Sequence, residues 1–447
     1  MNNNIRKFDS TTQYQKYRDT DGWAYPAVNV ISNGIEIQTH YNNELGMRWS
    51  TTDTKIVPTF LGEVSLSDFK TWVDNASYPC EIKKDGTDFA YIKRSTGSNI
   101  ADWTLRSDDS NSHYNTSDKT DYLQMTEIEN VNVGLFENTV EHWQEVRFNF
   151  DKGCPEGFHK WFAHPYWNEE RGCYTKLIGR YNSTPAGTKT SNTAAGINCA
   201  FGLSLGGTKY NNYTLGNWSA NTLLAATKAT NANLLEETYW EHVVLSYIFS
   251  AYYETFNHQS IFYGHATDYN IAENPNSPTG AGAGAGLNGH TDSLLTPHGT
   301  TVSNPSTTDG GYRFMHIENA IHGQQWIWGA GWVGNNGKYY MTYDDIKANA
   351  SATLTKSNAD VIGTYSTTLN GQYFGTADLW CVPTNASGGS SSTRYCDAAW
   401  SNKGTGRVAW LGEDAGGGGC NGGFARVFLY AAGPAYWVWR GRSTMNR

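Results

Sequence analysis

Charged residues are scarce in this chain. Asp, Glu, Lys and Arg together make up 17% of the 447 residues, against about 25% in an average soluble domain. The 42 acidic residues outnumber the 33 basic ones, and the formal net charge is −9. The basic residues are scattered, whereas nucleic-acid-binding proteins concentrate them in stripes or clusters. We therefore expect no nucleic-acid partner.

Long apolar stretches are missing as well. The opening residues, MNNNIRKFDS, contain no apolar core of the kind that a secretory signal requires. The longest apolar stretch, VVLSYIFSAYY at 243–253, is too short and too interrupted to span a bilayer. We expect a soluble protein that is made in the cytoplasm and does not insert into a membrane.

Motifs for metal and cofactor binding are also absent from the sequence. The cysteines are widely spaced and form no CxxC pair, which argues against a disulfide framework and against a zinc site. The histidine pairs His159/His164 and His290/His298 do not have the HExxH spacing of metalloproteases. We predict free thiols, no metal and no cofactor. The cysteines are Cys80, Cys154, Cys173, Cys199, Cys381, Cys396 and Cys420.

Aromatic and small residues take the place of the missing charges. Phe, Trp and Tyr make up 14% of the chain, and there are 47 glycines. In binding surfaces, Tyr and Trp provide rigid contact area, and Ser, Gly and Asn provide adaptable hydrogen bonds. The same composition is typical of a β-rich protein with many loops, so both interpretations stay open.

The region 36–150 is predicted to be a β-rich adaptor domain. Apolar and polar residues alternate in GIEIQTHY (34–41) and in VEHWQEVRFNFD (140–151), as in strands with one buried face. SLSDFKTWVDNA (65–76) predicts a short helix with Ser67 as its N-cap.

The remainder, 151–447, is predicted to be a second domain. Its strongest helix pattern is NLLEETYWEHVVLSYIFSAYYETF (233–256), in which Asn233 and Glu236 resemble a capping box. SPTGAGAGAGLNGHTDSLLTPHGT (277–300) predicts a low-complexity insertion. Short strand patterns between Gly-rich turns follow, so we expect the helix to pack on small twisted sheets.

Several motifs in this second region resemble a known family. IENAIHGQQWIWGAGWV (317–333) resembles the GNxWEW region of the formylglycine-generating-enzyme type of C-type lectin fold, with Gly323, Trp326 and Trp328 at the matching positions. WCVPT (380–384) is similar to the LPTE-like segment of the same proteins, and CDAAWSNKGTGRVAWLGEDAGGGG with GGFARVFLYAAGPAYWVWRGRS resembles their closing segment. The resemblance implies an α+β fold, in which a β-rich N-terminal region precedes a C-type-lectin-like domain with small twisted antiparallel sheets and one long helix.

One subgroup of this family consists of virion adhesins from phages and prophages of Bacteroidota, some of them diversified by retroelements. The N-terminal IRKFDSTTQYQKYRD, CPEGFHKWF (154–162) and the residues 238–264 resemble virion proteins of those phages. The resemblance implies a virion-located receptor-binding protein, such as a tail fibre, that forms a homotrimer. Residues 1–35 would attach it to other virion proteins, and 151–447 would bind a bacterial surface receptor, either a glycan or a protein.

Two departures from the family argue against enzymatic activity. The family enzyme has a close cysteine pair near its C-terminus, whereas Cys396 and Cys420 stand apart here. Gln324 and Ile327 replace the Asn and the Glu of the GNxWEW motif. The resemblance therefore implies neither catalysis nor an inherited metal site.

The resemblance places the ligand surface between residues 413 and 440, where diversified relatives vary. In FARVFLY (424–430), the large side chains from Phe424 to Tyr430 alternate with small aliphatic ones, which suit the core. Exposed aromatic side chains are expected chiefly where a partner covers them. The predicted ligand residues are Asp414, Cys420, Asn421, Arg426, Phe428, Tyr430, Tyr436, Val438 and Arg440.

Two other functions remain as alternatives. A structural decoration protein of the phage head or tail would use the fold only to pack against neighbouring subunits. A surface-glycan depolymerase would need two carboxylates roughly 5–10 Å apart. The candidate pairs Asp344/Asp345 and Glu236/Glu237 are adjacent in sequence, and such pairs more simply cap or solvate an element.

Overall fold

The computed structural model describes most of the N-terminal half of the chain and selected strands of the C-terminal half. The described residues are 27–31, 34–38, 42–94, 101–114, 116–162, 164–186, 196–200, 220–261, 291–292, 313–318, 320–321, 326–333, 338–342, 359–364, 369–373, 376–377, 381, 383–385, 389–390, 392–395, 397–401, 407–411, 423–424, 426–428 and 439–447.

A five-stranded antiparallel sheet forms one part of the fold. Its strands follow the order β11-β9-β10-β3-β4, so β9 and β10 are neighbours in both sequence and space. The bounds are β3 Glu44–Ser50, β4 Thr59–Gly62, β9 Asn132–Asn138, β10 Trp143–Asn149 and β11 Phe158–Lys160. The predicted strand at 140–151 is confirmed as β10.

A nine-stranded antiparallel sheet lies beside it. The order is β16-β30-β13-β8-β5-β6-β7-β17, and β12 pairs with β13 as well. The bounds are β5 Ser77–Lys83, β6 Phe89–Arg94, β7 Ala101–Arg106, β8 Tyr122–Glu129, β12 Tyr166–Asn168, β13 Cys173–Gly179, β16 Leu234–Glu236, β17 Thr291–Asp292 and β30 Ser443–Met445. The strand β30, from the far end of the chain, is an interior strand between β16 and β13.

An eight-stranded mixed sheet is built from the C-terminal part of the chain. Its order is β22-β21-β20-β27-β28-β26-β23, and β29 pairs in parallel with β20. The bounds are β20 Trp326–Val333, β21 Lys338–Thr342, β22 Ala359–Thr364, β23 Leu369–Tyr373, β26 Ala398–Ser401, β27 Arg407–Leu411, β28 Arg426–Phe428 and β29 Trp439–Arg440. We refer to it as the C-terminal sheet.

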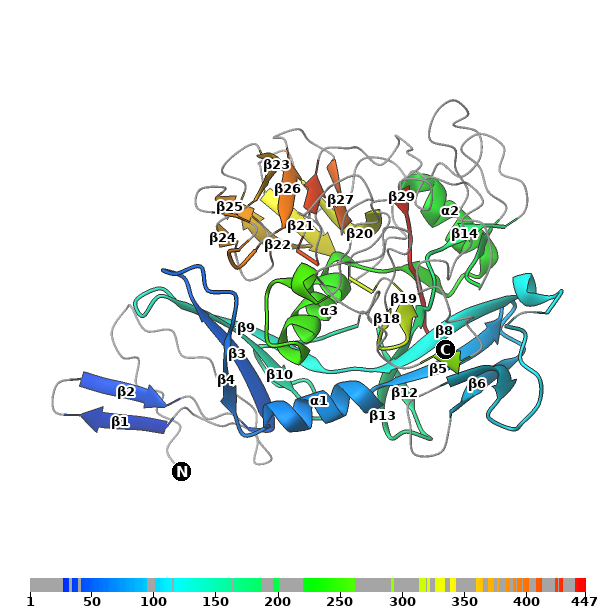
Figure 1. Ribbon diagram of the computed structural model, residues 1–447, viewed down its shortest axis with the longest axis horizontal. Coiled ribbons are helices and arrows are strands. Elements are labelled where there is room, and N and C mark those ends of the chain that lie inside the picture. The colour runs from blue at the N-terminus through cyan, green and yellow to red at the C-terminus, as the bar shows by residue number, and fades with distance from the viewer. Residues whose placement is uncertain are drawn as a thin grey trace.

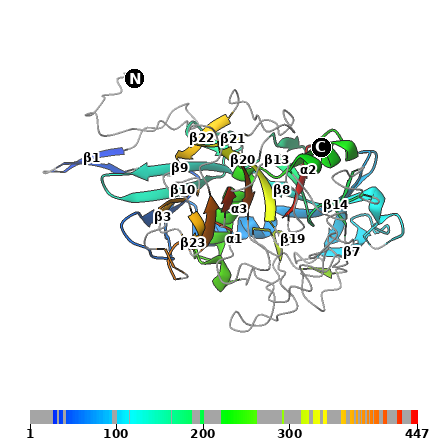
Figure 2. The same cartoon turned by 90° about the horizontal axis from the view of Figure 1, so that it is seen from above.

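The remaining elements are short. The hairpin β1–β2 confirms the predicted strand at 34–41, and it projects from the body of the protein in both views (Figures 1 and 2). The paired strands are β1 Ala27–Ile31 and β2 Gly34–Gln38, β14 Thr184–Pro185 and β15 Ile197–Asn198, β18 Arg313–Phe314 and β19 Ile317–Glu318, and β24 Thr376–Ala377 and β25 Pro383–Asn385. The helices are α1 Leu66–Asn75, α2 Ala220–Thr230 and α3 Tyr239–Tyr252, with 3-10 turns η1 Lys119–Asp121 and η2 His258–Ser260.

The helix α1 forms where the sequence predicts one, but its cap differs. The hydroxyl of Ser65, rather than Ser67, accepts the backbone N–H of Asp68 at 3.1 Å and so satisfies one of the free donors of the first turn. The buried side chains Phe69 and Val73, four residues apart, lie on one face of the helix. The helix prediction for 65–76 is confirmed.

The helix α3 is shorter than the sequence pattern predicts. It begins after Thr238, whose side chain and that of Glu241 form a capping box, so the predicted cap at Asn233 and Glu236 is wrong. Residues Leu234–Glu236 instead form β16. The helix is buried on all sides from Tyr239 to Ala251, which is typical of a central helix. It lies between the C-terminal sheet and the sheets that contain β8 and β10 (Figure 1).

One large core joins the two halves of the chain. The same cluster of buried side chains contains Val146, Val243 and Phe424. The sheets also cross the predicted boundary at residue 150, because β9 pairs with β11 and β8 pairs with β13. The predicted regions 36–150 and 151–447 are therefore not separated by their sheets or by this core.

The predicted α+β class, with a C-type-lectin-like domain and one long helix, is wrong for the described residues. The two antiparallel sheets and the mixed C-terminal sheet make the described fold mainly β, and helices contribute much less. The longest described helix, α3, has 14 residues and lies in the middle of the chain. One physical reason is that Leu234–Glu236, which the sequence pattern assigns to the helix, pair with β30 in a sheet.

Candidate functional site

Neighbouring strands of the C-terminal sheet frame the segment that the sequence predicts to bind a ligand. β27 pairs with β20 and with β28, and β20 also pairs with β29. The connections 412–425 and 429–438 therefore begin and end on strands of a single sheet. Segments joined to a rigid scaffold in this way commonly carry binding residues.

The predicted ligand residues fall into two groups. Arg426 and Phe428 lie in β28, and Arg440 lies in β29. Arg426 is the register partner of Leu411 in β27. The side chain of Leu411 is fully buried. The other predicted ligand residues lie outside the described part of the chain: Asp414, Cys420, Asn421, Tyr430, Tyr436 and Val438.

The exposed position expected for Phe424 is wrong. Its side chain is fully buried, because residues 423–424 form a turn before β28 rather than part of the strand. The ring packs against Tyr247 of α3 at 5.8 Å between centroids and against Tyr395 at 5.6 Å. The alternation of a strand therefore does not apply at this position.

The turn at Gly423 and Phe424, which we call the anchor turn, is fixed by buried polar side chains. The backbone N–H of Gly423 donates to Nδ1 of His258 at 3.1 Å, and that of Phe424 donates to a carboxylate oxygen of Asp397 at 2.9 Å. The hydroxyl of Ser246 donates to the carbonyl of Gly423 at 3.0 Å. These three hydrogen bonds engage both N–H groups of the turn and one of its carbonyls, and so fix the turn against α3.

The hydrogen bonds also assign the tautomer of His258. Because Nδ1 accepts the N–H of Gly423, the ring proton lies on Nε2, which is 2.7 Å from the hydroxyl oxygen of Ser250. Ser250 in turn donates to the carbonyl of Ser246, one turn earlier in α3. The neutral imidazole thus links α3 to the anchor turn.

Replacing Gly423 with alanine is expected to lower the free energy of unfolding by about 1–3 kcal/mol. A Cβ atom at this position would lie 2.7 Å from both Nδ1 of His258 and Oγ of Ser246, so the anchor turn would have to shift. Urea denaturation measures the effect. The matched control is Gly153→Ala, where a Cβ atom meets nothing within 4 Å, and equal losses for both variants would contradict the prediction.

A second anchor follows the predicted ligand segment, at residues 441–445. Arg442 is fully buried and donates to the carbonyl of Gly179 at 3.1 Å and to Oδ1 of Asn182 at 3.2 Å. Its Nε lies 3.4 Å from a carboxylate oxygen of Glu237. The carbonyl of Gly441 accepts the N–H of Ser183 at 2.8 Å. We call this group the C-terminal anchor.

The adjacent carboxyl groups of Glu236 and Glu237 belong to this anchor. Both side chains are buried, at 0% and 1% exposure, so a glycan substrate has no access to them as a catalytic pair. Burial raises the pKa of Glu236 to about 7, against a hydrogen bond from Thr227 that lowers it. The other candidate pair, Asp344 and Asp345, lies outside the described residues.

The described ranges bear on three further questions: metal binding, the state of the cysteines and membrane-spanning helices. No group of three or more His, Cys, Asp and Glu side chains there is arranged to hold a metal ion. Cys80, Cys154, Cys173, Cys199 and Cys381 are free thiols. None of the described helices is long and apolar enough to cross a membrane.

Sequence reasoning missed the residues that fix both anchors. His258 is 165 positions away from Gly423, and no local pattern indicates that the two meet. It also missed that GLSLG (202–206) has the GxSxG spacing of a serine nucleophile. Ser204 lies outside the described residues.

Two comparisons with known proteins were informative only in what they did not find. No family model matches this chain, and no curated protein matches it significantly. The resemblance to phage adhesins therefore stays a prediction from short motifs.

Proposed function

We propose that this protein is a non-enzymatic receptor-binding protein of a phage virion, and that residues 413–440 form its ligand surface. One observation carries most of the argument: the anchor turn lies between the connections 412–422 and 429–438, and the C-terminal anchor follows them. A surface that must tolerate different side chains needs fixed ends, because binding geometry depends on the supporting residues.

The N-terminal region supports the proposed attachment to a virion. The hairpin β1–β2 projects from the body of the protein (Figures 1 and 2), as a segment that attaches to another virion protein would. A homotrimer would present several copies of the ligand surface together, and linked copies raise weak affinities through effective concentration.

Replacing Asn421, Tyr430 and Tyr436 together with alanine is expected to reduce binding to host cells at least roughly tenfold, because large aromatic contacts dominate most interfaces. These positions leave the strands β27, β28 and β29 unchanged. The measurement is flow cytometry of the labelled protein on a panel of Bacteroidota strains. Circular dichroism confirms that the variant is folded.

The control replaces exposed apolar residues elsewhere. Val57, Val140 and Trp167 are 60%, 73% and 39% exposed, and their triple alanine variant should bind like the unchanged protein. Equal binding by both variants would place the ligand surface elsewhere. If the unchanged protein binds no strain but assembles with purified virion proteins, the structural decoration function replaces this proposal.

A further inference from the structure

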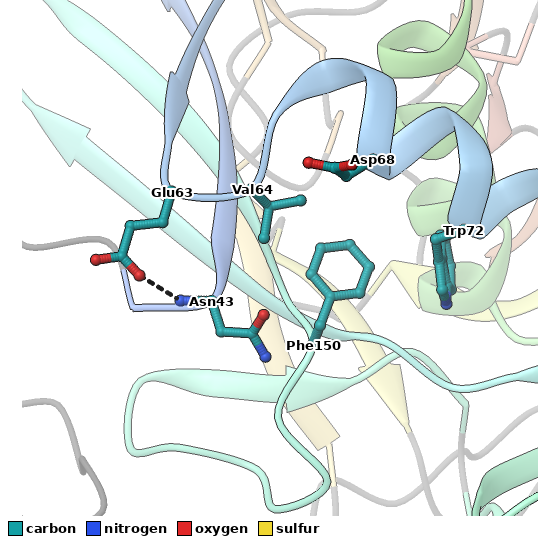
Figure 3. A pocket seen from close by; sticks show the side chains of 6 residues that line it. All are labelled: Asn43, Glu63, Val64, Asp68, Trp72 and Phe150. Carbon is teal, nitrogen blue, oxygen red and sulfur yellow. Dashed lines mark hydrogen bonds between the residues drawn. The ribbon is translucent and has the colours of Figure 1, made fainter.

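A groove of about 500 Å³ opens beside the start of α1 (Figure 3). It lies at the edge of the five-stranded sheet, between the β4–α1 connection and the end of β10. The side chains that line it combine aromatic rings with carboxylates. They belong to Asn43, Glu63, Val64, Asp68, Trp72 and Phe150.

The apolar wall of the groove is rigid. Phe150 and Trp72 meet edge to face with 5.3 Å between centroids, and both rings contact Phe69 of the main core. The ring of Phe150 occupies the centre of the lining, between Val64 and Trp72 (Figure 3). A flat, supported aromatic surface of this kind suits a ligand group that stacks.

The polar rim of the groove is acidic. The exposed carboxylate of Asp68 accepts the hydroxyl of Ser65 at 2.6 Å, and that of Glu63 accepts the backbone N–H of Asn43 at 3.3 Å. The amide of Asn43 donates to Asp151 at 3.0 Å, which brings a third carboxylate to the same rim. The described lining residues include no lysine or arginine.

The nearest cation on α1 does not offset this charge. Lys70 lies 2.7 Å from the carboxylate of Glu254. Asp68 itself lies in the first turn of α1, where the partial positive charge of the helix N-terminus favours a carboxylate. Among the described residues, the groove therefore combines an aromatic wall with an acidic rim.

We propose that this groove binds an arginine side chain of a partner protein. A guanidinium group is planar, so it stacks on an aromatic ring while its N–H groups donate to carboxylates at the ring edge. A neutral sugar would also stack, but it would leave the charge of Glu63 and Asp68 unmatched. Figure 1 places α1 and the C-terminal sheet on opposite sides of α3. The inference does not depend on the proposed receptor.

The test uses 19F NMR of the full chain labelled with 5-fluorotryptophan. The signal of Trp72, among 17 tryptophans, is assigned by its loss in Trp72→Phe. Addition of N-acetylarginine methylamide is expected to shift this signal with saturation in the millimolar range, because a single exposed contact is weak. High salt should reduce the shift.

Charge-neutral variants decide whether the carboxylates take part. Glu63→Gln with Asp68→Asn keeps the size and one acceptor oxygen of each side chain, and should weaken the arginine response roughly fivefold to tenfold. The matched control, Asp85→Asn with Asp108→Asn, removes the same charge from two exposed turns and should leave it unchanged. Circular dichroism checks both variants, and Asp68→Asn alone replaces the double variant if that fails to fold.

Three results would overturn the proposal. The first is a Trp72 signal that does not move with the arginine derivative at about 50 mM, well above the range expected for such a contact. The second is an equal response in the charge-neutral variant. The third is a response to methyl glucoside without one to arginine, which would identify a sugar site.

Discussion

Replacing Arg442 with methionine is expected to lower the free energy of unfolding by roughly 3–5 kcal/mol. The side chain is fully buried and lies 3.4 Å from Glu237, so its loss leaves a buried carboxylate without its main counter-charge. The imidazole of His242 lies 3.6 Å from the same carboxyl group. Urea denaturation followed by circular dichroism measures the change.

A second substitution separates the charge effect from the loss of packing. Glu237→Gln added to Arg442→Met should recover part of the lost stability, because removing both members of a buried pair costs less than removing one. Lys93→Met provides the surface comparison, since its partner Asp109 is exposed and such pairs contribute less than about 1 kcal/mol. If Arg442→Met resembles Lys93→Met, the C-terminal anchor does not stabilise the fold.

The stability of the protein is expected to fall as the pH rises from about 4.5 to about 7, in part because of Glu236. Burial raises the pKa of this carboxyl group from 4.5 to about 7 in the folded protein. In that interval the unfolded chain releases the proton and the folded chain keeps it, so each step toward higher pH favours unfolding. The full difference amounts to about 3 kcal/mol above pH 7.

The variant Glu236→Gln tests this linkage. A neutral amide does not titrate, so the variant should lose part of the pH dependence and be more stable than the unchanged protein at pH 8 by roughly 1–3 kcal/mol. Urea denaturation from pH 4.5 to 8.5 gives the two curves. Parallel curves would show that folding does not raise the pKa of the Glu236 carboxyl group.

Glu44 provides the control at a distant position. Burial raises its pKa to about 7 as well, although Arg147 acts in the opposite direction. Glu44→Gln should therefore remove a similar contribution in the five-stranded sheet, and the double variant should lose both. The effects should add, because the two groups lie in different sheets.

The elements that the sequence predicts well are those set by local pattern. The strands at 34–41 and 140–151 and the helix at 65–76 each carry their own periodicity and turn residues. The helix prediction fails at 233–238 because a distant strand, rather than the local pattern, sets the structure there. Leu234–Glu236 become a strand only because β30 pairs with them, and β30 lies some two hundred residues further along the chain.

In the candidate site, too, local pattern predicts some features and distant contacts set the others. The sequence predicts a ligand segment at 413–440, and the structure gives the strands at its ends. The alternation rule failed at Phe424 because hydrogen bonds from distant side chains hold that residue in a turn. The aromatic, acidic groove had no sequence signal, since its lining comes from Asn43, the β4–α1 connection and Phe150.

The interior position of β30 has a consequence for synthesis in the cell. Arg442 meets Gly179 across 263 residues, so the nine-stranded sheet cannot close until that whole length has been translated. At about 5–20 residues per second, the edge of β13 waits on the order of 15–50 s for its partner. During that time the exposed strand edge is open to pairing with other nascent chains, and we expect the newly made protein to depend on chaperones until β30 has been synthesised.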